Sequence, residues 1–172
     1  MKNLYKNFLL PFLVSLVLAA SALPSFAASL TDYGENVLAD SLFRGTQYSA
    51  TAPATYYVAL YTTACSDSAP GTEVAVGSYA RASIGRSLSA WTGTQGTAGS
   101  TSSGTNGTVG NAASVTFPAA TADWGTVTYW GIFDAATGGN AIICAPMTSA
   151  RSITNGSTAS FGAGALTVQI DN

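Results

Sequence analysis

The sequence predicts an all-β protein, an antiparallel β-sandwich of about seven strands with one helix near its N-terminus. Two observations predict the sandwich. Short runs rich in Val, Ile, Thr and aromatic residues alternate with a period of two. Clusters of Gly, Asn, Asp and Pro separate these runs at short intervals, as turns do in antiparallel sheets. A third observation, one stretch with helical spacing close to the N-terminus, predicts the helix.

The first residues have the three-part pattern of a secretory signal peptide. Two lysines precede an apolar run at residues 8–22, and a Ser-Phe-Ala sequence ends at Ala27. We expect residues 1–27 to be removed by cleavage between Ala27 and Ala28, with a cut after Ala22 as the alternative. A membrane-spanning helix needs about 20 apolar residues, and this run is shorter. We therefore expect residues 28–172 to form a single secreted domain without a membrane anchor.

Residues 29–45 are the predicted helix. Ser29 and Asp32 resemble a capping box, and Gly45 is a typical helix end. The helix has an apolar stripe, which either packs on a sheet or serves as an arm that binds a partner. The apolar residues at helical spacing are Leu30, Tyr33, Val37, Leu38 and Phe43.

Strands follow from residue 55 onwards. Residues 55–61 alternate, with aromatic or aliphatic side chains on both faces. Residues 66–71 have turn composition. Residues 71–81 lead into a strand that we expect to reach about Leu88. A short strand at 114–117 should end at Pro118, which cannot donate to a sheet.

The second half of the chain has the strongest hairpin signal. Residues 125–133 are aromatic and β-branched, residues 133–140 contain Asp134 and two consecutive glycines, and residues 140–148 form the expected return strand. Another Asn-Gly turn lies at 154–157. The closing strand, residues 165–170, should direct Leu166, Val168 and Ile170 inward.

Residues 92–113 stand apart because they contain almost no core-forming side chain. A loop of this length is uncommon in a packed domain and is usually functional or disordered. The Gly, Thr and Ser content predicts a flexible surface loop, with a tip that contacts a receptor as the functional alternative.

Composition excludes several classes of function. Beyond residue 27 the chain has four arginines against eight acidic residues and has no lysine or histidine. Nucleic acid is therefore a poor partner, and histidine-dependent catalysis is impossible. We expect no metal, cofactor or catalytic site. Paired carboxylates remain the one catalytic possibility, and the candidates Asp123, Asp134 and Glu73 more simply belong to turns and surfaces.

Cys65 and Cys144 are the only cysteines. An even number of cysteines in an exported chain predicts a disulfide, with two buried thiols as the alternative.

The sequence resembles a family of small tail-fibre-like virion proteins of tailed bacteriophages. Residues 115–140, VTFPAATADWGTVTYWGIFDAATGGN, carry the most specific part of the resemblance, and residues 30–48, 53–62, 71–81 and 165–171 add to it. The resemblance implies an all-β, non-catalytic virion component. The chain departs from the family pattern in its signal peptide, its cysteine pair and its insertion at residues 92–113, which together suit an oxidising exterior.

Two functions remain open from the sequence. The first is a structural subunit that assembles with itself into a virion part or an extracellular fibre or coat, located in the virion, in the periplasm or at the cell surface. The second is a monomeric adhesin that stacks glycans on its aromatic side chains, which otherwise belong to the core. These aromatics are Tyr48, Tyr56, Tyr57, Tyr61, Tyr79, Trp91, Trp124, Tyr129 and Trp130.

Overall fold

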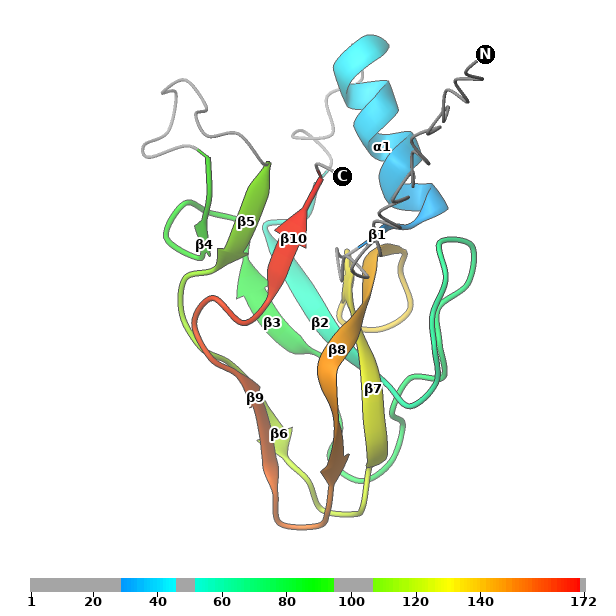
Figure 1. Ribbon diagram of the computed structural model, residues 1–172, viewed down its shortest axis with the longest axis vertical. Coiled ribbons are helices and arrows are strands. Elements are labelled where there is room, and N and C mark those ends of the chain that lie inside the picture. The colour runs from blue at the N-terminus through cyan, green and yellow to red at the C-terminus, as the bar shows by residue number, and fades with distance from the viewer. Residues whose placement is uncertain (1–28, 46–51, 95–106, 171–172) are drawn as a thin grey trace, which may run out of the picture.

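The computed structural model describes residues 29–45, 52–94 and 107–170, which form ten strands and one helix (Figure 1). The predicted signal peptide and its cleavage point between Ala27 and Ala28 lie outside these ranges. The elements are β1 (Ser29–Leu30), α1 (Asp32–Phe43), β2 (Thr55–Tyr61), β3 (Ala82–Gly85), β4 (Trp91–Thr92), β5 (Thr108–Asn111), β6 (Val115–Ala119), β7 (Gly125–Phe133), β8 (Ala141–Ile153), β9 (Thr158–Phe161) and β10 (Thr167–Gln169).

All strand pairs are antiparallel, as the sequence predicted, and the single helix lies near the N-terminus. A five-stranded sheet has the order β1-β8-β7-β2-β3. A three-stranded sheet, β10-β5-β4, and a two-stranded sheet, β6-β9, form the second layer. The main core lies between the layers and combines residues from both, including Trp130 from β7 and Phe117 from β6.

The central strand β2 is covered on both faces, as its alternating sequence predicted. Val58 and Leu60 belong to the main core between the layers. Ala59 and Tyr61 lie on the opposite face and pack with Phe133 of β7. Fully buried aliphatic and aromatic side chains on both faces fix the register of this strand, because a shift of one residue would exchange the two faces.

Helix α1 begins later than the sequence predicted. Thr31 is the N-cap, and its hydroxyl accepts a hydrogen bond from the Gly34 amide at 3.2 Å. The predicted capping role of Ser29 is wrong, because Ser29 pairs with Cys144 as part of β1. The helix contacts β8 so closely at Gly34 that any Cβ there would overlap the carbonyl oxygen of Ile142.

Several strand boundaries differ from the prediction. Residues 108–111, expected in the flexible loop, form β5, and its Asn111 is 1% exposed. Strand β3 ends at Gly85, short of the predicted Leu88. Pro118 lies within β6, at an irregularity in its pairing with β9, instead of ending the strand. Ile170 lines the same apolar cleft as Val168 but is 57% exposed, because regular pairing of β10 ends at Gln169.

Strand β8 is also longer than expected and forms much of one edge of the five-stranded sheet. Among the described residues, β1 pairs with its outer edge opposite Cys144 and Ile143, and the Thr31 amide donates to the Ile142 carbonyl at 3.0 Å. Beyond that point, Pro146 and a register shift interrupt the regular edge: Tyr129 pairs with Pro146, whereas Val127 pairs with Arg151. Proline and bulges are the devices that discourage edge-to-edge pairing between molecules.

Candidate functional site

The three candidate carboxylates do not come together as a catalytic pair; each one holds a local structure. Asp123, between β6 and β7, accepts a hydrogen bond at 2.7 Å from the amide of Asn155, which lies in the β8–β9 turn. Asp134 closes the β7–β8 hairpin by accepting from the Asn140 amide and side chain, at 2.7 and 2.9 Å. Glu73 pairs with Arg81. All three carboxylates are thus used for turns and ion pairing.

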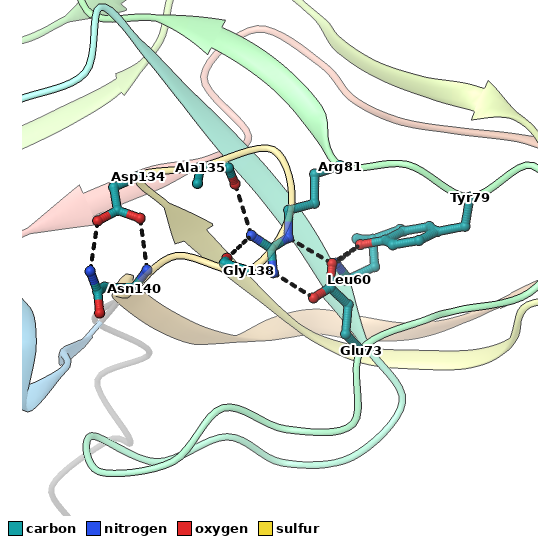
Figure 2. Close-up of polar contacts among 8 residues, drawn as sticks. All are labelled: Leu60, Glu73, Tyr79, Arg81, Asp134, Ala135, Gly138 and Asn140. Atoms are coloured by element: carbon teal, nitrogen blue, oxygen red, sulfur yellow. Dashed lines mark hydrogen bonds and ion pairs between the residues drawn. The ribbon is translucent and has the colours of Figure 1, made fainter.

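Arg81 is the centre of a dense polar cluster (Figure 2). Its Nε and Nη2 donate to the two carboxylate oxygens of Glu73, each at 2.8 Å. Its Nη1 donates to the carbonyl oxygens of Ala135 and Gly138, both at 2.8 Å. The guanidinium also lies 3.5 Å from the ring centroid of Phe133, a cation–π geometry.

Tyr79 completes this cluster. Its hydroxyl donates to Glu73 Oε1 at 2.9 Å and accepts from the Leu60 amide at 3.0 Å. Burial of the ring raises the pKa of Tyr79 far above its ordinary value, so the hydroxyl stays neutral. Burial alone would lower the pKa of Arg81, but the hydrogen bonds and the charge of Glu73 outweigh it and raise the pKa.

The cluster of Arg81, Glu73 and Tyr79 therefore acts as a clamp. It ties the segment before β3 to strand β2 and to the loop between β7 and β8. The Arg81 side chain is 7% exposed, and four of its five N–H groups donate to acceptors of its own domain, so it is poorly placed to bind a substrate. The clamp fixes the shape of the exposed hairpin tip at 136–139.

A disulfide joins Cys65 to Cys144, with the two Cα atoms 6.3 Å apart. Cys65 lies in the loop after β2, and Cys144 lies in β8 next to β1. The same loop meets the start of α1, where the Asp32 amide donates to the Asp67 carbonyl at 2.9 Å. The disulfide thus fixes this loop over the second, smaller core around Tyr61 and Phe133.

Clefts of two different kinds open on the described surface. One, of about 530 Å³, lies between β8 and β9 and combines hydroxyl groups such as Ser149 and Ser160 with Arg151 and an apolar floor. The other, of about 330 Å³, lies between α1 and β10 and is lined largely by apolar side chains, among them Leu38 and Val168.

The aromatic side chains considered for glycan stacking are mostly committed to the interior. Tyr48 lies outside the described residues. Of the others, Tyr61, Trp124 and Trp130 are at most 5% exposed, and the remaining five are partly buried. Trp124 packs edge-on against Tyr79, with ring centroids 5.2 Å apart. None of these eight described aromatic side chains is fully exposed.

A buried residue that the sequence analysis missed is Asn111. Its side-chain amide donates to the carbonyls of Ala113 and Gly162, and its oxygen accepts from the Leu166 amide at 2.8 Å. It joins β5 to the segment before β10. Asn111 lies in a Gly-, Ser- and Thr-rich stretch that looks like a loop, so composition gave no sign of its burial.

Within the described ranges, no helix is long and apolar enough to cross a membrane. The same ranges contain no group of three or more side chains suited to hold a metal ion.

Comparison with known proteins gives one informative result. No curated protein matches the chain. A family model described as podophage GP4 fiber I protein gp80 matches residues 29–169, which include every strand and the helix of the structure. The chain therefore belongs to the podophage GP4 fiber I protein family.

Proposed function

We propose that this fibre-family protein is a non-enzymatic structural subunit that assembles with copies of itself into a virion part or an extracellular fibre. Membership of a podophage fibre family supports a structural role in the virion. The observation that supports self-assembly is the low number of charged residues. Beyond residue 27 the chain has only four arginines and eight acidic residues. Three of these charged side chains already bind within the domain: Arg81 and Glu73 in the clamp, and Asp134 in the β7–β8 turn.

A charge-poor surface of Ser, Thr, Gly and Ala favours association for a simple reason. Like charges normally keep soluble domains apart, and few are available here. Contacts made mainly by uncharged groups depend little on ionic strength. We therefore expect the protein lacking residues 1–27 to form oligomers or fibres at micromolar concentration at both low and high salt.

Multi-angle light scattering over a dilution series, with negative-stain electron microscopy of the same samples, tests this proposal. A growing mass that is insensitive to salt supports self-assembly. A constant monomer mass at all concentrations would refute it.

The second candidate function is glycan binding by an adhesin. The cleft between β8 and β9 favours it, because hydroxyl groups and Arg151 surround an apolar floor. A glycan array probed with the protein and with an Arg151→Ala variant tests this candidate. Binding that is lost in the variant supports it, and absence of binding to any glycan leaves the structural role alone.

We also propose that the protein is exported before assembly. The signal-peptide pattern and the Cys65–Cys144 disulfide are consistent with passage through an oxidising compartment. The proposed location is the periplasm, the cell surface or the virion.

A further inference from the structure

The outer face of the last two turns of α1 carries an exposed apolar patch. Ala39, Leu42 and Phe43 are spaced i, i+3 and i+4, so they lie side by side on one face of the helix. Leu42 is 65% exposed and Phe43 is 85% exposed, the highest values among the large hydrophobic residues of the described chain. We call these three residues the α1 patch.

The α1 patch takes no part in holding the helix on its own domain. The helix faces the domain with its other side, where Gly34 meets Ile142 of β8 and Leu38 lines the apolar cleft. Figure 1 shows α1 standing out from one end of the molecule, with its first turn next to β1 and β8. A helix of this length is marginal in water without packing. A second surface that covers the α1 patch would therefore stabilise the helix.

We propose that the α1 patch is a contact between two copies of this chain, with the two α1 helices packed antiparallel across a twofold axis. The proposal rests on the self-assembly proposed above and names one surface that produces it. A twofold contact needs a self-complementary patch, and a short apolar stripe around a small residue, Ala39, meets this need. The edge of β8 is a weaker candidate, because Pro146 and a bulge interrupt it.

The charges on α1 set the antiparallel direction. Asp32 and Glu35 lie in the first turn, and Arg44 follows the last turn. In an antiparallel pair, Arg44 of each copy lies opposite the acidic first half of the other helix, and the helix dipoles also oppose each other. A parallel pair would place acid against acid and arginine against arginine.

Glu35 and Arg44 are well placed for this contact. Glu35 lies four residues before Ala39, on the same face as the patch, and Arg44 follows Phe43 directly. Arg44 already pairs with Asp40 of its own helix at 3.0 Å, and this pair is exposed. A guanidinium has five donors, so Arg44 can also donate to a second carboxylate, from the other copy.

The first experiment removes the apolar contact. A Leu42→Ser/Phe43→Ser double variant should dissociate at least about tenfold more readily than the unmodified protein in sedimentation velocity, since two large apolar side chains leave the interface. A Val76→Ser/Leu88→Ser variant is the matched control, because Val76 and Leu88 are also exposed, at 46% and 45%, and lie outside α1. Circular dichroism checks that each variant is folded.

The second experiment tests the direction of packing. Glu35→Arg alone and Arg44→Glu alone each place like charges across an antiparallel contact and should weaken association. In an equal mixture of the two variants, each mixed pair has one acid opposite one arginine at both ends of the contact, so association should be restored. Homogeneous variants that associate as well as the mixture would overturn the antiparallel arrangement.

The outcomes separate this proposal from the one on which it rests. If the unmodified protein stays monomeric at every concentration, self-assembly is wrong and the α1 contact is wrong with it. If the unmodified protein associates and the Leu42→Ser/Phe43→Ser variant associates equally well, self-assembly stands and another surface forms the contact.

Discussion

Arg81 connects segments that are distant in sequence, and it does so with a planar group that lysine cannot imitate. The guanidinium donates in parallel to both oxygens of Glu73 and still reaches the Ala135 and Gly138 carbonyls. The exposed tip of the β7–β8 hairpin thus derives its shape from a side chain more than fifty residues earlier.

We expect Arg81→Lys to lower the free energy of unfolding by about 2 kcal/mol, because one ammonium group replaces only part of these hydrogen bonds. Urea denaturation measures the change. Arg151→Lys, at an exposed position of β8, is the control and should change stability by less than about 0.5 kcal/mol. Equal effects of the two substitutions would show that the clamp does not stabilise the fold.

Unlike the hydrogen-bonded guanidinium of Arg81, the buried hydroxyl of Tyr61 has no hydrogen-bond partner in the described structure. The residue is 1% exposed. We expect Tyr61→Phe to leave the unfolding free energy unchanged or to raise it by up to about 1 kcal/mol, because an unsatisfied buried hydroxyl is removed.

The same substitution should change the response to alkaline pH. Burial, and to a smaller extent the charge of Glu73, raises the pKa of Tyr61 above its ordinary value of 10.0. A phenol held neutral in the folded state contributes stability below pH 10, and this contribution is lost as the pH rises above that value. The unfolding free energy should fall less steeply above pH 10 in Tyr61→Phe than in the unmodified protein. Denaturation curves at about pH 8 and about pH 11 test this, and identical slopes would contradict it.

At the scale of elements, α1 packs tightly against β8 of the sheet at Gly34. Glycine inside a helix normally costs about 0.5–1 kcal/mol relative to alanine, so Gly34 would look replaceable from sequence alone. In the structure, the backbone carbonyl oxygen of Ile142 lies too close to Gly34 to leave room for a Cβ.

We therefore expect Gly34→Ala to destabilise the protein by about 1–3 kcal/mol, since backbone must move to admit the methyl group. Gly162→Ala is the matched control, because a Cβ there meets nothing within 4 Å and its φ is not in the left-handed region. The control should be neutral or slightly stabilising. Thermal denaturation of both variants measures the two effects. A Gly34→Ala protein as stable as the unmodified one would mean that α1 does not pack tightly against Ile142 at this position.

Elements with strong local signals could be predicted from the sequence. Strand β7 and its hairpin turn were predicted because aromatic and β-branched residues lead into two glycines, Gly138 and Gly139, which adopt positive φ. Strands β5 and β9 were missed because such short segments, made largely of small or polar residues, carry little periodicity. Both strands form by pairing with distant segments.

The candidate site was less predictable for a related reason. The Glu73–Arg81 pair is close in sequence, but the Ala135 and Gly138 carbonyls that Arg81 binds are backbone groups with no sequence signature. The exposure of Phe43 was equally hidden, and Leu42 lay outside the predicted apolar stripe. Helical spacing identifies an apolar stripe, whereas only the packing of α1 shows which part of that stripe is covered.

At the scale of the whole molecule, export can be tested directly. The intact mass of the protein recovered outside the cytoplasm should correspond to a chain that begins at Ala28, because the residues before it form a signal-peptide pattern. A non-reducing peptide map of the same sample should contain Cys65 and Cys144 in one linked peptide. Retention of Met1, or two free thiols, would contradict the proposed route.

The disulfide also determines how a fibre built from this protein would bear mechanical load. Tension applied across the chain from Ser29 to Ile170 passes through the covalent bridge, so the polypeptide between Cys65 and Cys144, with β3 to β7, cannot lengthen. Strand β1 lies directly beside one end of the bridge, because Ser29 pairs with Cys144. In such a subunit only the segments outside the Cys65–Cys144 loop can be extended by force. A fibre of these subunits would therefore resist stretching.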